Sequence, residues 1–577
     1  MPFKGWREQQ YDAQLAKSLS DSLKISLLLS RLLVQRGVTD HSTAHRFLHP
    51  SVEQLHDPFQ LPDFSKSIDR LVTAVQKKQP IVIHGDYDAD GVTSTVMVSR
   101  LLELLGARVS YYIPNRFSDG YGLSPESVKK HSDAGAKVIV SVDCGIRSVS
   151  AAVTAEELNV DLIITDHHEP FITAQGNVEL PKAFSVINPS LISSSYPERN
   201  LSGAGVAFKL VQGLCQQTGH QNWLPAFTKL AAIGTVADVV PLQGENRVIV
   251  SLGLDQLSSG PNNVGLDALV EVAGLAGKRI DSENLAFRVI PRLNAAGRMG
   301  SADLAARLLL TNDPSSEREA NGLARELDEL NTQRRLEQSN VFTKAKERID
   351  ADSEIGSHRV IVIGGEGWHR GVIGIVASKL VETYERPSIV LSIKGEMAYG
   401  SARNTAHFDL LGGLTQCAEL FTQFGGHRMA AGVTLETANL ATLQLRMNQY
   451  AEMRASDEED KFQLEIDAPL ELKELNVEVV AGINQLKPFG QGNPEPVFQA
   501  SGVRIMEGPT VLKDQHLVMT LNQEGHVFRA IAWQSAHRRE FFLGLGGVID
   551  VAYSIMENHF RGEYSVQLSV ADVREAR

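Results

Sequence analysis

The chain has 577 residues, which suggests about three or four domains at roughly 150 residues each. Its 43% hydrophobic and 22% charged residues are ordinary for a soluble globular protein. The 56 Lys and Arg residues stand against 69 Asp and Glu, and the net charge of −13 argues against a protein that coats nucleic acid non-specifically. A nuclease is not excluded, because clustered carboxylates can be metal ligands and a basic groove can coexist with an acidic exterior.

The cysteines and the N-terminal sequence indicate a soluble cytoplasmic protein. Cys144, Cys215 and Cys417 are scattered, which fits neither a disulfide framework nor a thiolate zinc site. The first residues contain no apolar core of signal-peptide length. The most apolar early stretch is interrupted by Arg31 and is too short to span a bilayer, so we expect no membrane contact.

The first third of the chain alternates short apolar runs with helical patterns. Such alternation predicts βαβ units and a parallel sheet. Ser124 is a suitable N-cap for the second of the helices. The expected strands lie at 81–83, 107–114, 136–145 and 160–170, and the expected helices at 92–107, 124–136 and 148–158.

Further along the chain, changes in composition predict the domain organisation. Residues 1–60 read as a helical segment that packs on the first α/β domain, residues 61–315. The charged stretch 316–352 predicts a long helix between domains, although one more surface helix explains it equally well. Residues 353–458 predict a second α/β domain, and the short strands of 459–577 a small barrel or sandwich. The apolar stripe of the long helix consists of Leu323, Leu327 and Leu330.

Residues suited to binding a ligand follow the predicted strands at the points where they end. In an open parallel sheet, ligands bind beyond the carboxyl ends of the strands, so these side chains converge if the strands are neighbours. A further apolar stretch, at 230–242, delivers Asp238. The strand-end residues are His84, Asp86, Asp88 and Asp90 after the first run, Asp143 after a second, and Asp166, His167 and His168 after a third.

So many carboxylates in one place predict a metal site. Converging carboxylates repel and raise one another's pKa unless a cation compensates them. Carboxylates with one or two imidazoles suit Mg²⁺ or Mn²⁺. The ligands are too many for one ion, and two ions about 3.5–4 Å apart that share a carboxylate would use them all. Sites of this kind hydrolyse phosphate esters.

Each piece of the pattern also has a simpler explanation. An isolated Asp-x-Asp after a strand is often a turn or a helix cap, and an isolated His-His pair is often structural. Asp143 could cap the helix that follows it. Independent caps would not all fall at successive strand ends, however, so their joint occurrence favours a dinuclear phosphoesterase.

The chain resembles the DHH phosphoesterases in four successive segments, HGDYDADG, SVDCG, TDHHEP and GTVADVVPL. Seven more segments resemble, in order, the RecJ family of bacterial exonucleases: IPNRFSDGYGLS, LSGAGVAFKL, PRLNAAGRMG, GWHRGVIGIVASKL, GSARN, FGGHRMAAG and KPFGQGNPEPVF. The resemblance implies a parallel-sheet DHH domain, a long connecting helix, a second α/β domain that is DHH-associated, and a C-terminal β-barrel of the OB-fold type.

The resemblance also implies an activity and its cofactors. These are 5′→3′ digestion of single-stranded DNA to mononucleotides, in recombination and repair, and two divalent ions, Mg²⁺ or Mn²⁺. By resemblance His84, Asp88 and Asp143 would hold one ion, and Asp143 would bridge to the second. The ligands implied for the second ion are Asp90, Asp143, His167 and Asp238.

Further residues are implied at the reacting phosphate. His168 would contact the scissile phosphate and stabilise developing charge. Arg298 and His427 would lie near the same phosphate. Asp86 is the extra acid of the motif, and it would act either as a base or in support of the metal ligands.

A pocket for the 5′ phosphate is implied by Arg116, Ser401 and Arg403. Arginine's planar fork suits phosphate. Without the motifs around them, these arginines would be interpreted as surface salt bridges. Gly425 and Gly426 would let the backbone approach DNA closely.

The barrel would hold the strand through backbone contacts and base stacking. Phe528, Trp533 and Tyr564 are candidates for stacking, although core packing is the simpler explanation for each. By resemblance, the partners would be single-stranded DNA, single-stranded-DNA-binding protein and recombination helicases, with the chain itself a monomer. Two alternatives remain, a DHH phosphodiesterase for short oligonucleotides and a non-catalytic DHH-fold scaffold; the intact ligand set argues against the second.

Overall fold

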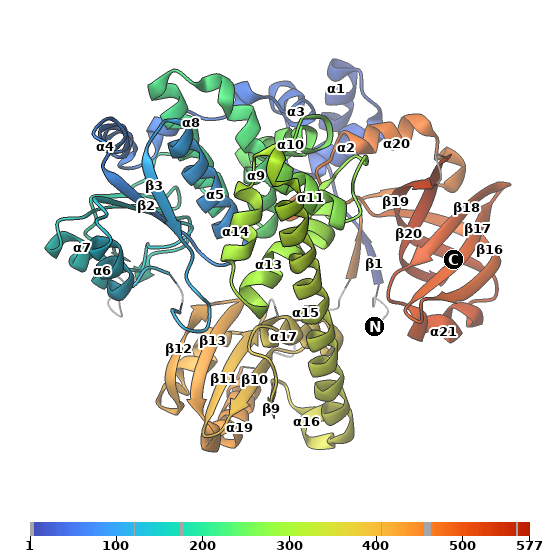
Figure 1. The fold of residues 1–577 in the computed structure, drawn as a ribbon. Coiled ribbons are helices and arrows are strands. Elements are labelled where there is room, and N and C mark those ends of the chain that lie inside the picture. The colour runs from blue at the N-terminus through green and yellow to red at the C-terminus, as the bar shows by residue number, and fades with distance from the viewer. Residues whose placement is uncertain are drawn as a thin grey trace. The chain divides into compact units, whose positions relative to one another are not determined.

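The computed structural model (Figure 1) describes residues 5–120, 122–172, 178–405, 407–454, 463–560 and 563–576. The chain divides into two compact units. One consists of Asp57–Asp238 and Gly253–Glu458, and the other of Met1–His56, Val239–Leu252 and Glu459–Arg577. Among the described residues, no helix is long and apolar enough to cross a membrane.

A five-stranded parallel sheet forms the centre of the first unit, as the alternating pattern predicts. The strands lie in the order β3 (Arg108–Tyr112), β2 (Pro80–His84), β4 (Val138–Val142), β5 (Asp161–Thr165) and β8 (Ser185–Ile187). Because β2, β4 and β5 are neighbours, the polar residues that follow them meet at one edge of the sheet.

Helices cover both faces of this sheet (Figure 1). On one face, Val82, Ile139 and Leu162 pack against Val128 of α6 and Ala151 of α7. Helices α5, α8 and α9 pack against one another, and α5 and α8 contact the sheet. The helices are α4 (Phe64–Gln76), α5 (Ala89–Leu104), α6 (Pro125–Asp133), α7 (Val149–Glu157), α8 (Gly203–Thr218) and α9 (Leu224–Ala237).

The predicted long helix is α15 (Glu317–Ala351), at 35 residues. Its N-terminal half packs against α11 (Val264–Val272), α13 (Ile290–Met299) and α14 (Asp303–Leu310). Its C-terminal half joins the core of the second α/β domain through Val341, Ala345 and Ile349. The predicted stripe is confirmed at Leu323 and Leu327, which are buried.

The second α/β domain contains a five-stranded mixed sheet in the order β12-β13-β11-β10-β9. Only β9 and β10 pair in parallel, as expected for strands joined through a helix. The strands are β9 (Ile361–Glu366), β10 (Ser388–Lys394), β11 (Met397–Arg403), β12 (Phe421–His427) and β13 (Ala430–Glu436), and the helices are α17 (Ile373–Tyr384) and α19 (Leu440–Met453).

A closed barrel forms the C-terminal part of the second unit. Its strands pair in the order β16-β17-β18-β20-β19, and β19 pairs back with β16. This closure settles the choice between a barrel and a sandwich in favour of the barrel. The strands are β16 (Phe498–Leu512), β17 (His516–Gln523), β18 (His526–Ala532), β19 (Val548–Phe560) and β20 (Glu563–Glu575).

The N-terminal helices share a core with this barrel. Leu29, Leu32 and Leu33 of α2 belong to the same apolar cluster as Phe498 and Tyr553 of the barrel. The sequence places residues 1–60 on the catalytic domain. The apolar side chains of α2 pack with the barrel instead, whereas Phe59 packs against Phe64 of α4, with 5.3 Å between ring centres. The strand β1 also pairs in parallel with β14. These elements are β1 (Gly5–Glu8), α1 (Ala13–Leu23), α2 (Leu27–Gln35), α3 (His41–Leu48) and β14 (Gln463–Ile466).

Arg247 ties the segment Val239–Leu252 into the same unit. Its guanidinium lies 3.7 Å from the centre of the Phe47 ring. It donates hydrogen bonds to the carbonyl oxygens of Phe47 (3.1 Å), Leu486 (2.9 Å) and Lys487 (2.7 Å). Burial, reinforced by the positive charge of Arg36, lowers the pKa of Arg247 to about 9.

Candidate metal centre and phosphate pocket

Residues after three neighbouring strands meet in the first unit, as the sequence predicts. The loop after β2 carries Asp86 and Asp88, Asp143 follows β4, and His167 and His168 follow β5. Asp143 adopts a left-handed backbone conformation with φ of 60°, which is uncommon outside glycine and typical of functional sites. Asp238, at the end of α9, comes to the same place.

Three groups of side chains within the centre could each hold a cation. Within each group, one possible ligand atom from every residue lies within 4.8 Å of the others. Asp143 belongs to two groups and so can serve two ions. The groups are Asp86, Asp88 and Asp143; Asp90, His167 and Asp238; and Asp143, His167 and His168.

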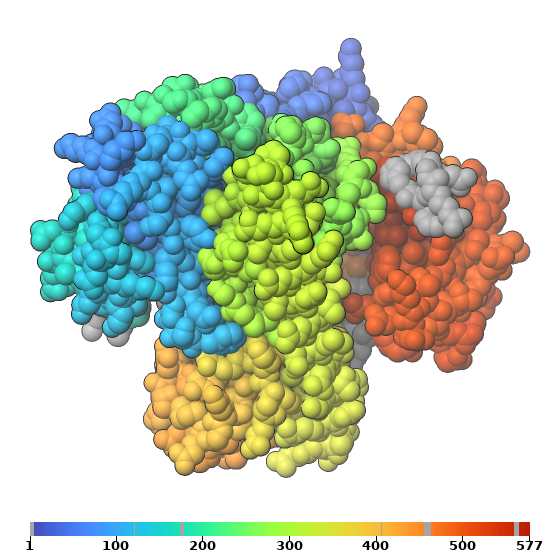
Figure 2. Space-filling view, viewed as in Figure 1, coloured from blue at the N-terminus to red at the C-terminus, as the bar shows by residue number. Residues whose placement is uncertain are grey.

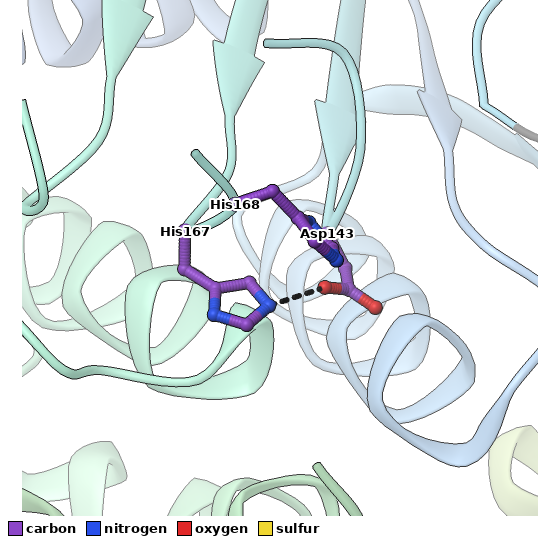
Figure 3. Close-up of side chains that lie close together, drawn as sticks. All are labelled: Asp143, His167 and His168. Carbon is purple, nitrogen blue, oxygen red and sulfur yellow. Dashed lines mark ion pairs between the residues drawn. The ribbon is translucent and has the colours of Figure 1, made fainter. Parts of the chain in front are cut away.

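His167 lies between two carboxylates. Its Nε2 forms ion pairs with Asp143 Oδ1 at 3.3 Å and with Asp238 Oδ2 at 3.5 Å, and Figure 3 shows its ring turned toward Asp143. Asp86 Oδ1, Asp143 Oδ1 and His167 Nε2 are buried, and none of the three forms a hydrogen bond with another described residue. Buried polar atoms normally form hydrogen bonds, so divalent cations fit this centre.

The electrostatics support the same conclusion. Burial, together with repulsion from Asp88, raises the pKa of Asp86 to about 8. Burial and neighbouring carboxylates raise the pKa values of Asp90 and Asp143 well above the usual range. Carboxylates are maintained in their charged form under these conditions only if a compensating cation is close.

The N-terminus of α8 holds Asp90 in place. Its two carboxylate oxygens accept hydrogen bonds from the backbone N–H groups of Gly203 (2.8 Å) and Ala204 (2.7 Å). Each oxygen keeps a further lone pair for a cation. A Cβ at Gly203 would overlap the carboxylate of Asp143. The helix start therefore fixes two of the candidate ligands.

Asp88 combines both roles that the sequence offers. As the N-cap of α5, its Oδ1 accepts hydrogen bonds from the backbone N–H groups of Asp90 (3.0 Å) and Gly91 (3.1 Å). The cap interpretation is therefore correct for this residue, yet its carboxylate also belongs to the group with Asp86 and Asp143.

Asp166 orients the two histidines, a role that the sequence analysis does not assign to it. Its Oδ1 accepts hydrogen bonds from the backbone N–H groups of His167 (2.8 Å) and His168 (3.1 Å) and lies 2.7 Å from His168 Nδ1. Burial alone would raise the pKa of Asp166, but the His168 hydrogen bond and charge lower it to about 2. Asp166 is the first residue of the Asp-His-His segment, and this position is the signal in the sequence that could have indicated its role.

The structure does not bring His84 into any of these groups. Its Nδ1 lies 3.1 Å from Nε2 of His131, and its Nε2 lies 3.4 Å from the carbonyl oxygen of Gly122. Side chains alternate along β2, so His84 shares the face of Val82, which α6 and α7 cover. Asp86 joins Asp88 and Asp143 in a group, and His84, which the resemblance implies as a ligand beside Asp88 and Asp143, lies outside it.

The candidate arginines line a second part of the site. The guanidinium of Arg116 lies 4.1 Å from the centre of the Tyr87 ring. Arg403 donates a hydrogen bond to Ser401 Oγ (2.8 Å), and Arg298 donates one to the Gly371 carbonyl (3.2 Å). Among the described residues, none of these arginines forms an ion pair with a carboxylate, which leaves their charge available for an anion.

The arginines also act on one another. Burial, with repulsion from Arg116, lowers the pKa of Arg298 to about 10 and also lowers the pKa of Arg403. Buried and mutually repelling guanidinium groups gain stability when a phosphate is bound between them. The salt-bridge interpretation therefore does not hold for Arg116, Arg298 or Arg403 in the described part of the chain.

His427 and the neighbouring glycines lie on β12. Burial, with repulsion from Arg403 and Arg147, lowers the pKa of His427. The charge of His168 also contributes to lowering the pKa of His427. Gly425 is exposed and has open space where a Cβ would be, so a substrate backbone can approach there. Gly426 packs against Ala430 and Ala431.

The candidate stacking residues differ in exposure. Trp533 is 47% exposed and lies against the His516 ring, with 4.9 Å between ring centres. Phe528 is partly buried against the barrel core, in line with the simpler explanation. The side chain of Tyr564 lies outside the described residues.

Three family models match the chain, in the order of its domains. They are the DHH family, N-terminal domain, at residues 80–235, the DHHA1 domain at 357–453, and the RecJ OB domain at 466–572.

Characterised relatives match nearly the whole chain. The single-stranded-DNA-specific exonuclease RecJ of Bacillus subtilis is 36% identical over 570 residues, which cover 98% of this chain and 70% of the relative. The protein of the same name from Escherichia coli is 32% identical, with 95% of each chain covered.

Solved structures show the same likeness. The RecJ structure in complex with Mn²⁺ from Thermus thermophilus has a TM-score of 0.82 and 29% identity, and covers 99% of this chain and 80% of its own. A second structure, of exonuclease RecJ bound to manganese, has a TM-score of 0.60 and 34% identity, and covers 70% of this chain and 97% of its own.

Proposed function

Because the chain belongs to the RecJ family of single-stranded-DNA-specific exonucleases, we propose that its metal centre removes mononucleotides from the 5′ end of single-stranded DNA. The chain is a metal-dependent exonuclease that binds single-stranded DNA, and its cofactors are Mg²⁺ or Mn²⁺. The observation that carries the proposal is Asp143, which belongs to two groups of candidate ligands at once.

Asp86, Asp88 and Asp143 would hold one ion, and Asp90, His167 and Asp238 would hold the other. Asp143 would be shared with the second ion, because its Oδ1 lies 3.3 Å from His167 Nε2 and the two residues also form a group with His168. When bound, such a pair of ions activates a water and stabilises the attacking and leaving oxygens of a phosphodiester. The three buried atoms that form no hydrogen bond among the described residues support this assignment.

The residues of the chain then act on the substrate. His168, oriented by Asp166, would donate to the scissile phosphate as charge develops on it. Arg298, half-buried and without a carboxylate partner among the described residues, would neutralise the same phosphate. His427 would approach it from β12 of the second α/β domain.

The 5′→3′ direction of digestion would follow from the pocket for the 5′ phosphate. Arg116, Ser401 and Arg403 would bind the terminal 5′ phosphate, so that the chain enters the site with that end first. Gly425 and Gly426 would line the path of the strand. The barrel would hold the strand further along, with Trp533 as the most exposed of the candidate stacking residues that are described.

The proposal extends to organisation and partners. The domains would be residues 1–60, 61–315, 316–352, 353–458 and 459–577, with the first contributing to the barrel core. The enzyme would act in the cytoplasm as a monomer, with single-stranded-DNA-binding protein and recombination helicases as partners.

One digestion separates this proposal from its alternatives. The substrates are a long single strand labelled in its 5′ phosphate, its duplex and a short oligonucleotide, each with Mg²⁺, with Mn²⁺ and with EDTA. We expect the long single strand to be digested to mononucleotides and the duplex to resist digestion. No digestion should occur in EDTA. Digestion of only the short oligonucleotide would indicate a small-substrate phosphodiesterase, and binding without digestion would indicate a scaffold.

A further inference from the structure

The loop that precedes α17, together with the first turn of that helix, contacts both parts of the site. A Cβ at Gly371 would overlap the carbonyl oxygen of Arg298, and Arg298 donates a hydrogen bond back to the Gly371 carbonyl (3.2 Å). One helical turn later, a Cβ at Gly374 would lie 3.0 Å from both Ser401 Oγ and Arg403 Nη2. This short segment therefore spans from the scissile-phosphate side to the 5′-phosphate side.

An aromatic stack holds this segment to the first α/β domain. Phe117 packs edge-on against His369, with 5.9 Å between ring centres. The guanidinium of Arg370 lies 3.8 Å from the centre of the Tyr399 ring and 5.9 Å from that of Phe117. Figure 2 shows blue surface of the first α/β domain against the orange and yellow surface of the second domain.

Hydrogen bonds hold the turn that carries Phe117 in place. Asp119 accepts hydrogen bonds from the hydroxyl of Tyr112 (2.6 Å) and the backbone N–H of Asn115 (3.0 Å). The Asn115 side chain donates to the carbonyl oxygen of Gly300 (3.4 Å). Arg116, adjacent to Phe117, therefore rests on a turn fixed to β3, to the end of α13 and to the second domain.

We infer that Phe117 and residues 369–374, together the interdomain clamp, fix the separation between the two phosphate sites and thereby the length of the released product. The inference rests on the proposed function. A strand whose 5′ phosphate is seated in one site presents to the metal centre only the phosphodiester at that separation. Gly371 and Phe117 are thus positioning residues, because they act through Arg298 and Arg116.

Gly371→Ala tests the clamp by inserting a methyl group against Arg298. The full-length protein with Mn²⁺ digests 5′-phosphorylated and 5′-hydroxyl single strands in single-turnover reactions, and product lengths are resolved. Misplacement by about 1 Å costs on the order of 100-fold. We expect dinucleotides and longer products to appear, and the rate preference for 5′-phosphorylated ends to fall by roughly 10–100-fold.

Gly322→Ala is the matched control, because a Cβ at this exposed position of α15 meets no atom within 4 Å. Its products and end preference should equal those of the wild type. The inference would be overturned if Gly371→Ala still released only mononucleotides and kept the wild-type end preference. A lower rate or a lower melting temperature in this variant would not change that conclusion.

Phe117→Ala provides the second test, and it decides the matter if Gly371→Ala does not fold. It loosens the clamp without a clash, so we expect longer products and a weaker end preference, with recovery in Phe117→Tyr. Unchanged products in Phe117→Ala contradict the clamp. Failure of the wild type itself to release mononucleotides contradicts the proposed function instead.

Discussion

Asp143 is the side chain on which the metal centre depends most, because it belongs to two of the three groups of candidate ligands. We expect Asp143→Ala to reduce hydrolysis by more than the roughly 10–100-fold that loss of a supporting partner costs. Calorimetric titration with Mn²⁺ should lose at least one binding event, while fluorescence anisotropy shows that single-stranded DNA still binds.

Asp69→Ala is the control for that substitution, because Asp69 is an exposed carboxylate on α4. Its metal binding and turnover should match the wild type. Normal turnover in Asp143→Ala would contradict the assignment of the centre.

The raised pKa of Asp86 predicts how pH acts on the metal-free protein. The pKa is about 8 in the folded state and about 3.9 in an unfolded chain. Between these values the folded state binds the extra proton, so stability should fall as pH rises from about 4 to about 8. Mn²⁺ must displace this proton, so its affinity should rise over the same range.

Melting temperatures of the EDTA-treated protein across that range check the first expectation, and calorimetric titrations with Mn²⁺ check the second. The Asp86→Asn variant should weaken both trends, because an amide does not titrate, while Asp90 and Asp143, whose pKa values are also raised, keep the remainder. If the melting temperature of the metal-free protein rose as the pH approached about 8, the raised pKa assigned to this buried carboxyl would be contradicted.

Arg403→Ala should lower the preference for 5′-phosphorylated over 5′-hydroxyl ends by roughly tenfold or more, because a hydrogen bond to a charged group contributes about 1.5–3 kcal/mol. Rates on the two substrates give this ratio directly. Arg359→Ala, at an exposed arginine of the same domain, should leave it unchanged. An equal loss on both ends in Arg403→Ala would argue against the phosphate pocket.

Single residues show where sequence reasoning succeeds and where it stops. The spacing of the motif places Asp88, Asp90 and Asp143 at strand ends, and the structure brings them together. It does not decide between His84 and Asp86, since His84 still belongs to β2 whereas Asp86 lies in the loop after the strand ends. His131, the partner of His84, lies 47 residues away on α6, and no local pattern connects the two.

At the scale of elements, α8 contributes to the metal centre through its first turn. The free N–H groups and the positive end of the helix dipole both favour the Asp90 carboxylate there. We expect Gly203→Ala to weaken Mn²⁺ affinity by roughly 10–100-fold, because the added methyl would displace the Asp143 carboxylate. Calorimetric titration measures this without substrate.

The control is Gly482→Ala, in a helix position where a Cβ meets no atom within 4 Å. It should leave Mn²⁺ affinity unchanged and slightly raise the melting temperature, since alanine favours helices over glycine by about 1 kcal/mol. Wild-type affinity in Gly203→Ala would show that α8 does not position the ligands.

The elements themselves were largely predictable because their signals are local. The strand runs and the Ser124 cap appear as expected, and the parallel direction of β2, β4 and β5 follows from the helices between them. The contribution of α8 was not predictable, because "LSGAG" carries no charge and acts through backbone N–H groups. The sequence around Gly371 likewise gives no indication of its role, since that role depends on the packing of two domains.

At the scale of the whole molecule, the two units divide the chain in a way that composition does not reveal. Residues 5–48 and the barrel share one apolar core although they are separated by more than 400 residues along the chain. The pairing of β1 with β14 and the hydrogen bonds of Arg247 join three distant segments. Apolar periodicity indicates that a helix is amphipathic, but not which distant surface it covers.

Leu32 of α2 and Leu71 of α4, each fully buried, allow the division into two cores to be tested. Leu→Ala at such a site costs about 2–5 kcal/mol. In Leu32→Ala, hydrogen exchange should accelerate in the barrel strands β16 and β19, whereas β2 and β4 keep their protection. Leu71→Ala should produce the reverse pattern. Acceleration of β2 and β4 in Leu32→Ala, with the barrel unaffected, would instead place the N-terminal helices on the catalytic domain.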